Sequence, residues 1–230
     1  MGFLAFPNYI LKKRIKKFFE LLPDNSVAII FSPSYKIRSN DVEFRFRPSS
    51  RVLYLTGIKD PQVIVVFSKK KLKDGIEEKT YVFRKKLTEE EKVWIGENTP
   101  DDEIKSVADE VLDLSDFEAK IYEILQGAKN IFYPVGEEDQ KLDLIISSNF
   151  RRLRGRARYG ILIPNFISDV DLILGKLRIK KDDYEINLIK TAVSITKKAL
   201  SEVEKKIQPG VLEYEIEAEI IRYYRIFGGF

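Results

Sequence analysis

The side chains best suited to chemistry are concentrated between Asn40 and Arg47, a segment that reads Asn-Asp-Val-Glu-Phe-Arg-Phe-Arg. The 230-residue sequence contains no cysteine and no histidine, which excludes thiol nucleophiles, Ser-His-Asp triads and imidazole metal ligands. Carboxylates and arginines remain, and they can either bind a ligand at a cleft edge or pair with one another. We favour pairing: Glu43 with Arg45 or Arg47 in a partly buried network, while Asn40 or Asp41 turns the chain.

The local pattern around these charges indicates a strand. Val42, Phe44 and Phe46 alternate with polar residues. Since alternate side chains of a strand point to opposite faces, this spacing predicts one buried face. The charged residues are then expected at the rim of a packed layer.

Three other features have simpler explanations. The arginine-rich segment 151–158 could bind nucleic acid, but aromatic residues do not alternate with its arginines, so we expect a solvated helix end. Trp94 is the only tryptophan, and it is either a core anchor or part of an interface. Glutamates two apart on a helix point to different faces and cannot converge on one metal ion, which excludes a metal site at Glu213, Glu215, Glu217 and Glu219.

The composition predicts a globular chain with a mixed-charge surface. Apolar residues make up 44% of the sequence, and 40 basic and 36 acidic residues are interspersed to give a net charge of +4. The apolar patch Phe3–Phe6 is too short for a signal peptide. No segment approaches the ~20 apolar residues of a membrane span. We therefore expect a cytoplasmic protein that binds neither nucleic acid nor membranes.

Strands and helices alternate along the first 160 or so residues. Short apolar runs predict buried strands at Ser26–Ser32, Gln62–Ser68, Thr80–Arg84 and Asn130–Pro134. The polar stretch 69–79 is expected to be a hairpin loop. Helical periodicity is present at Asn8–Leu22, Asp101–Val111, Ser115–Leu125 and Glu138–Leu153, and Thr88 with Glu91 forms a capping box for another helix. The pattern predicts an α/β fold with a sheet flanked by helices.

The last part of the sequence is helical. A broken pattern at Ile163–Asp171 predicts a domain linker, and helices follow at 183–207 and Glu213–Ile226 around Pro209-Gly210. Both helices carry an apolar stripe for which the sequence offers no later partner. We expect this hairpin to self-associate or to be poorly ordered.

The segment Asn40–Ile58 closely resembles the signature of the aminopeptidase P N-terminal domain. The matching positions are Asn40, Asp41, Val42, Glu43, Arg45, Phe46, Arg47, Tyr54, Leu55, Thr56 and Gly57. Glu91–Gly96 resembles the family's tryptophan-centred segment. Leu177–Lys190 and Ile207–Glu219 resemble the opening of its pita-bread catalytic domain.

The resemblance implies a creatinase-like mixed β-sheet for residues 1–172 and a helical fragment of a pita-bread domain for residues 173–230. It implies that the parent protein is an Xaa-Pro aminopeptidase, a metallopeptidase that removes the residue before a proline. Two divalent metals, expected to be manganese, are held in that family by residues beyond the end of this chain. This truncated chain is therefore expected to hold no metal, cofactor or catalytic residue and to be inactive alone.

In the full-length enzyme the N-terminal domain is expected to shape the groove for peptide substrates and to mediate a homo-oligomer. The structural or interface candidates are Asn40, Asp41, Glu43, Arg45, Arg47, Tyr54 and Trp94. A non-catalytic peptide- or protein-binding module derived from the same fold is the main alternative. A nucleic-acid binder using the arginine-rich segment 151–158 is a second one.

Overall fold

Within residues 6–137 and 140–228, which this computed structural model describes, a six-stranded mixed sheet organises the first of two compact units. The units are Met1–Leu177 and Arg178–Phe230. Most of the Phe3–Phe6 patch and the predicted helix start at Glu138 lie outside the described residues. The proposed division into functional domains at residue 172 stays a prediction.

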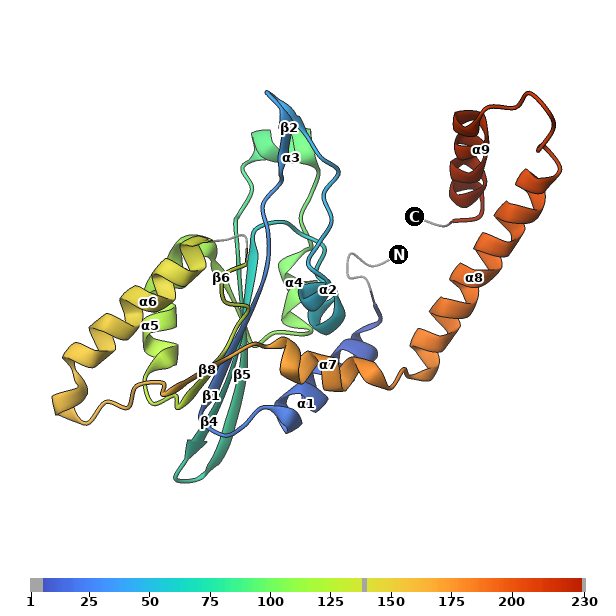
Figure 1. Ribbon diagram of the computed structural model, residues 1–230. Coiled ribbons are helices and arrows are strands. Elements are labelled where there is room, and N and C mark those ends of the chain that lie inside the picture. Colours follow the sequence, from blue (N-terminus) through green and yellow to red (C-terminus); the bar gives the residue numbers. More distant parts are fainter. Residues whose placement is uncertain (1–5, 138–139, 229–230) are drawn as a thin grey trace. The chain divides into compact units, whose positions relative to one another are not determined.

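The sheet has the strand order β6-β5-β4-β1-β7-β8 (Figure 1). The strands are β1 (Ser26–Ser32), β4 (Val63–Leu72), β5 (Gly75–Arg84), β6 (Glu110–Asp113), β7 (Asn130–Phe132) and β8 (Phe166–Ser168). β4 pairs antiparallel with β1 and β5, while the β1–β7, β5–β6 and β7–β8 pairs are parallel. A separate two-stranded hairpin is formed by β2 (Ile37–Ser39) and β3 (Val42–Glu43).

Helices cover both faces of the sheet, which confirms the predicted α/β layers. Figure 1 shows α5 (Phe117–Leu125) and α6 (Gln140–Gly155) on one side, with α1 (Asn8–Leu21), α2 (Ser50–Thr56) and α4 (Asp101–Lys105) on the other. The side chains of β1 point alternately to the two faces of the sheet, which explains why helices pack on both. Val27 and Ile29 are buried against α5 and α6, whereas Ala28 and Ile30 are buried against α1, α2, α4 and α7 (Asp171–Ile179). A strand that is covered on both faces needs the continuous apolar run seen in the sequence.

Three local expectations are wrong. Residues 69–79 are not a loop, because β4 continues to Leu72 and β5 begins at Gly75. Their polar side chains suit a solvated hairpin whose backbone ladder continues regardless of side-chain type. The predicted helix from Asp101 ends at Lys105, and β6 follows. The predicted linker contains β8 and the start of α7.

The second unit is a pair of helices, α8 (Asp183–Glu204) and α9 (Glu213–Ile226). Asp182 and Glu185 form a capping box at the start of α8. An apolar groove of about 850 Å³ runs along the pair and includes Val193, Leu200 and Ile216. In the described ranges no helix combines the length and apolarity needed to cross a bilayer.

Candidate functional site

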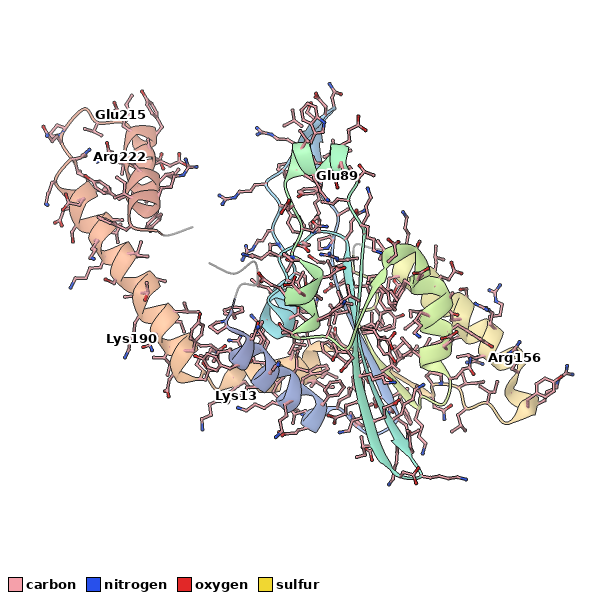
Figure 2. All side chains as sticks on the ribbon, turned by 180° about the vertical axis from the view of Figure 1, so that it is seen from behind. Lys13, Glu89, Arg156, Lys190, Glu215 and Arg222 are labelled. Carbon is pink, nitrogen blue, oxygen red and sulfur yellow. The ribbon has the colours of Figure 1, made fainter. Side chains whose placement is uncertain are left out.

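Two of the sequence-predicted candidates, Glu43 and Trp94, line one pocket of about 490 Å³. The pocket lies between the β2–β3 hairpin and α3 (Glu89–Ile95), which Figure 1 shows at the same end of the first unit. Figure 2 labels Glu89 at the start of α3 there. Tyr35, Ile37, Leu87, Glu90 and other side chains complete the lining.

The hairpin places Glu43 on the pocket side. Asn40 has φ 45°, a left-handed conformation that asparagine tolerates better than most residues, and it lies at the turn between β2 and β3. The pairing of Ile37 with Glu43 then brings both side chains to the pocket. The prediction that Asn40 or Asp41 turns the chain is confirmed at Asn40.

A capping box fixes the start of α3, as the sequence predicts. The Thr88 hydroxyl accepts from the Glu91 backbone N–H at 3.2 Å, and the Glu91 carboxylate accepts from the Thr88 N–H at 3.0 Å. Lys85 also donates to Glu91. This lysine, followed by the Thr88 backbone bond, lowers the pKa of Glu91 below its ordinary value.

Trp94 is 84% exposed, so the core-anchor interpretation is wrong. Neighbouring Val93 is 82% exposed, and no residue of α3 is buried. The ring of Trp94 therefore lies on the surface, at the edge of the pocket. The interface alternative for Trp94 stays a prediction.

The charged segment is also more exposed than expected. Asn40, Asp41, Glu43, Arg45 and Arg47 are all exposed, and the predicted partly buried network is therefore wrong. Val42 and Phe44 remain 52% and 55% exposed, so the predicted buried face of this strand is wrong as well. The cause is that β2 and β3 form their own small sheet instead of joining the central one.

Tyr54 has a different setting, on α2. Its backbone carbonyl accepts a hydrogen bond from the buried Arg14 at 3.0 Å. The Arg14 guanidinium also lies 4.3 Å from the centroid of the Tyr54 ring. Tyr54 therefore serves as a packing partner for a buried cation, which is a structural role.

Arg51, also on α2, makes a double ion pair that the sequence does not reveal. It donates to both carboxylate oxygens of Glu137 at 2.7 Å and to those of Asp171 at 2.8 and 2.6 Å. These hydrogen bonds raise the pKa of Arg51, the Asp171 bond being the larger cause. The arginine joins α2, the segment after β7 and the first residue of α7.

A second unforeseen cluster lies around Asp60, which is 7% exposed. Its carboxylate accepts from the Thr99 backbone N–H at 3.1 Å and from the Thr99 hydroxyl at 2.9 Å. Arg84 approaches the same carboxylate at 3.5 Å. Buried carboxylates need such partners, so this cluster stabilises the loops beside the pocket.

The arginine-rich end of α6 is solvated. Its arginines are exposed, and Figure 2 shows Arg156 projecting from the outer end of the helix. The guanidinium groups of Arg152 and Arg156 lie 4.1 and 5.9 Å from the centroid of the Tyr122 ring. This packing gives part of the segment a structural role; the absence of nucleic-acid binding stays a prediction.

No cluster of three or more histidine, cysteine, aspartate or glutamate side chains within the described ranges is arranged to hold a metal ion. The candidate site is therefore an aromatic and acidic pocket on the surface of the first unit. Its chemistry is binding through ring faces and carboxylates.

Comparison with known proteins agrees with this description. Residues 11–133 match the family model "Aminopeptidase P, N-terminal domain". Xaa-Pro aminopeptidase of Escherichia coli is 26% identical over 211 residues, which cover 91% of this chain and 47% of that protein. The mitochondrial intermediate cleaving peptidase 55 of Arabidopsis thaliana is 26% identical, covering 90% of this chain and 40% of that protein.

Solved structures give the same result. A variant of E. coli aminopeptidase P superimposes with a TM-score of 0.87 at 25% identity, covering 97% of this chain and 50% of that one. Proline aminopeptidase P II of Yersinia pestis shares the fold with a TM-score of 0.87 at 23% identity, covering 97% of this chain and 51% of that one. The chain thus spans about half the length of the relatives it matches, and it is homologous to their N-terminal half. From the family match, the shared fold and this coverage, we conclude that the chain belongs to the family of aminopeptidase P N-terminal domains.

Proposed function

We propose that this chain is the N-terminal part of an Xaa-Pro aminopeptidase, and that its first unit shapes a peptide groove and contributes to a homo-oligomer. The observation that carries the proposal is the homology along 91% of the chain to the N-terminal half of the E. coli enzyme. The exposed side chains of Val93, Trp94 and Ile95 on α3 support it, because an exposed apolar surface is typical of contact sites. The functional domains would divide near residue 172, in a cytoplasmic protein.

The metals implied by the family do not fit the described residues of this chain. One solved relative is a zinc-substituted E. coli aminopeptidase P in complex with product. Here the sequence has no histidine, and the described carboxylates form no cluster suited to a metal. We therefore assign the two divalent metals, expected to be manganese, and the hydrolytic step to residues outside this chain.

A non-catalytic peptide- or protein-binding module is the second candidate. The observation that favours it is the pocket itself, whose walls are all supplied by this chain. Binding at that pocket needs no metal and no second domain. The two candidates therefore differ in turnover and agree in binding.

The test compares this chain with the complete product of its gene. Both are assayed with added manganese on a tripeptide that has proline second, and on a control peptide with alanine in that position. We expect the complete product to release the first residue of the proline peptide only, and this chain alone to match the manganese-free blank. A complete product that binds peptides without cleaving them would support the binding module instead. Turnover by the chain alone that persists through repurification would refute the assignment of the chemistry to other residues.

A further inference from the structure

The pocket between the β2–β3 hairpin and α3 has aromatic and apolar walls. Tyr35 and Trp94 line it together with Ile37, Leu87 and Ile95. Its volume of about 490 Å³ lies in the range typical of small-ligand sites, roughly 300–1,000 Å³. It can therefore admit a large side chain with part of the backbone that carries it.

The charges that line this pocket do not balance. Glu43, Glu90 and Glu91 contribute carboxylates, and Lys85 is the one basic residue among the lining side chains. Lys85 is already hydrogen-bonded to Glu91. No ion pair within the described ranges reaches Glu43 or Glu90. Two carboxylates are thus left without a neutralising partner at the pocket wall.

The basic residues of the hairpin do not line this pocket. Ile37 and Glu43 line it, while Lys36 and Phe44 line a separate cavity of about 240 Å³. Arg45 lines that second cavity too. The pocket lining therefore gains no positive charge from Lys36, Arg45 or the other basic residues of the hairpin.

Tyr35 also lies within reach of the carboxylate of Glu43. Its pKa is raised above the ordinary value, first by burial and then by the charges of Glu43 and Asp60. A field that opposes the ionisation of a phenol also attracts a cation. The tyrosine ring is held in place by Phe46, whose ring centroid lies 5.2 Å away.

We propose that this pocket binds the basic side chain of a peptide, with the guanidinium or ammonium group between Glu43 and Glu90 and its stem against Tyr35 and Trp94. Cations bind favourably over the faces of tyrosine and tryptophan, and carboxylates pair with the same groups. The inference rests on the peptide binding that both candidate functions share, and it adds which kind of side chain this pocket takes. It specifies a preference for arginine or lysine in the bound peptide.

The test uses the fact that Trp94 is the only tryptophan, so its emission reports directly on the pocket. The whole chain is titrated with blocked tripeptides that carry arginine, lysine, alanine or glutamate in the centre, and calorimetry is run in parallel. We expect saturable binding of the arginine and lysine peptides with a Kd on the order of millimolar, weakening as salt is added. The alanine and glutamate peptides should bind at least about fivefold more weakly.

Matched variants separate the pocket from the general charge of the surface. Glu43→Gln and Glu90→Gln should each weaken arginine binding about threefold, and the double variant about tenfold. Glu97→Gln removes the same charge from an exposed residue that does not line the pocket, and it should leave binding within about twofold. All three positions are exposed, so the variants are expected to fold.

Four results would overturn the proposal. They are equal binding of all the peptides, no signal by either emission or calorimetry, equal losses in Glu97→Gln and Glu43→Gln, or an emission change that depends on protein concentration without peptide. The last result would identify a second copy of the chain as the occupant.

Discussion

Replacing Arg51 by methionine should destabilise the first unit by about 2 kcal/mol. Methionine keeps the apolar stem and removes the guanidinium that pairs with Glu137 and Asp171. The side chains of Glu137 and Asp171 are 43% and 51% exposed, so both ion pairs are partly solvated. Because both pairs are bidentate, we assign each about 1 kcal/mol, the upper end of the range for surface pairs. At 2–4 °C per kcal/mol for a domain of this size, the melting temperature should fall by about 4–8 °C.

The reasoning has a matched control in Arg38, an exposed arginine of the same unit for which no ion pair is described. Arg38→Met should change stability by no more than about 0.5 kcal/mol, as is usual for surface substitutions. Arg51→Lys should lower the free energy of unfolding by about half as much as Arg51→Met. Lysine keeps the positive charge but lacks the planar guanidinium that makes the bidentate hydrogen bonds. Calorimetric melting checks all three variants. If Arg51→Met melts together with Arg38→Met, the double pair contributes nothing and α7 is held by apolar contacts alone.

Three further outcomes are expected. Asp60→Ala removes the acceptor of the Thr99 N–H and hydroxyl bonds, while Arg84 keeps its ion pair with Asp101, so the variant should cost about 2 kcal/mol in denaturant unfolding. A loss below about 0.5 kcal/mol would show that water replaces the carboxylate. Burial, followed by the charge of the neighbouring aspartate, raises the pKa of Tyr133 to about 12. The folded state thus holds this proton more tightly than an unfolded chain, in which the tyrosine pKa is near 10. The free energy of unfolding should therefore decline as pH rises from about 10 to about 12. In the ultraviolet absorbance titration, Tyr133→Phe should remove the phenol that titrates last. Val193→Glu places a charge in the apolar groove of α8 and α9. It should reduce the concentration-dependent self-association that light scattering measures. Scattering identical to that of the unaltered chain would show that copies do not associate through this groove.

The central strands could be predicted from the sequence because their burial is a local signal. β1 is covered on both faces, and a short continuous run of apolar residues is typical of such a strand. The capping box at Thr88 was equally readable, since it depends on two residues three positions apart, and the start of the helix at residue 183 was predicted as well. Short-range rules therefore recovered the core of the sheet and the starts of two helices.

The candidate site depends on long-range relations that no local pattern contains. Arg51 meets partners 86 and 120 residues away. The exposure of Trp94 depends on how the rest of the chain packs around α3, and the local sequence of α3 does not contain that information. The edge strands β6 and β8 have four and three residues, too few for a period to be recognised. The sequence therefore left the core and interface interpretations of Trp94 open, and the exposure of its side chain rules out the first.

The difference in strand length across the sheet also bears on solubility. β4 and β5 are ten residues long, but β6 pairs with β5 only from Tyr81 to Arg84, and β1 pairs with β4 only as far as Lys69. No described strand pairs with the far end of the β4–β5 hairpin on either margin, although the Lys71 N–H donates to the Asn25 side chain at 3.0 Å. Unpaired strand edges are the kind of surface on which amyloid-like stacking begins. That end carries Lys70 and Lys71 on one strand and Glu77 and Glu78 on the other. A second hairpin that docks β4 against β4, or β5 against β5, would bring like charges together, so these side chains disfavour those two ways of recruiting a copy of the ribbon.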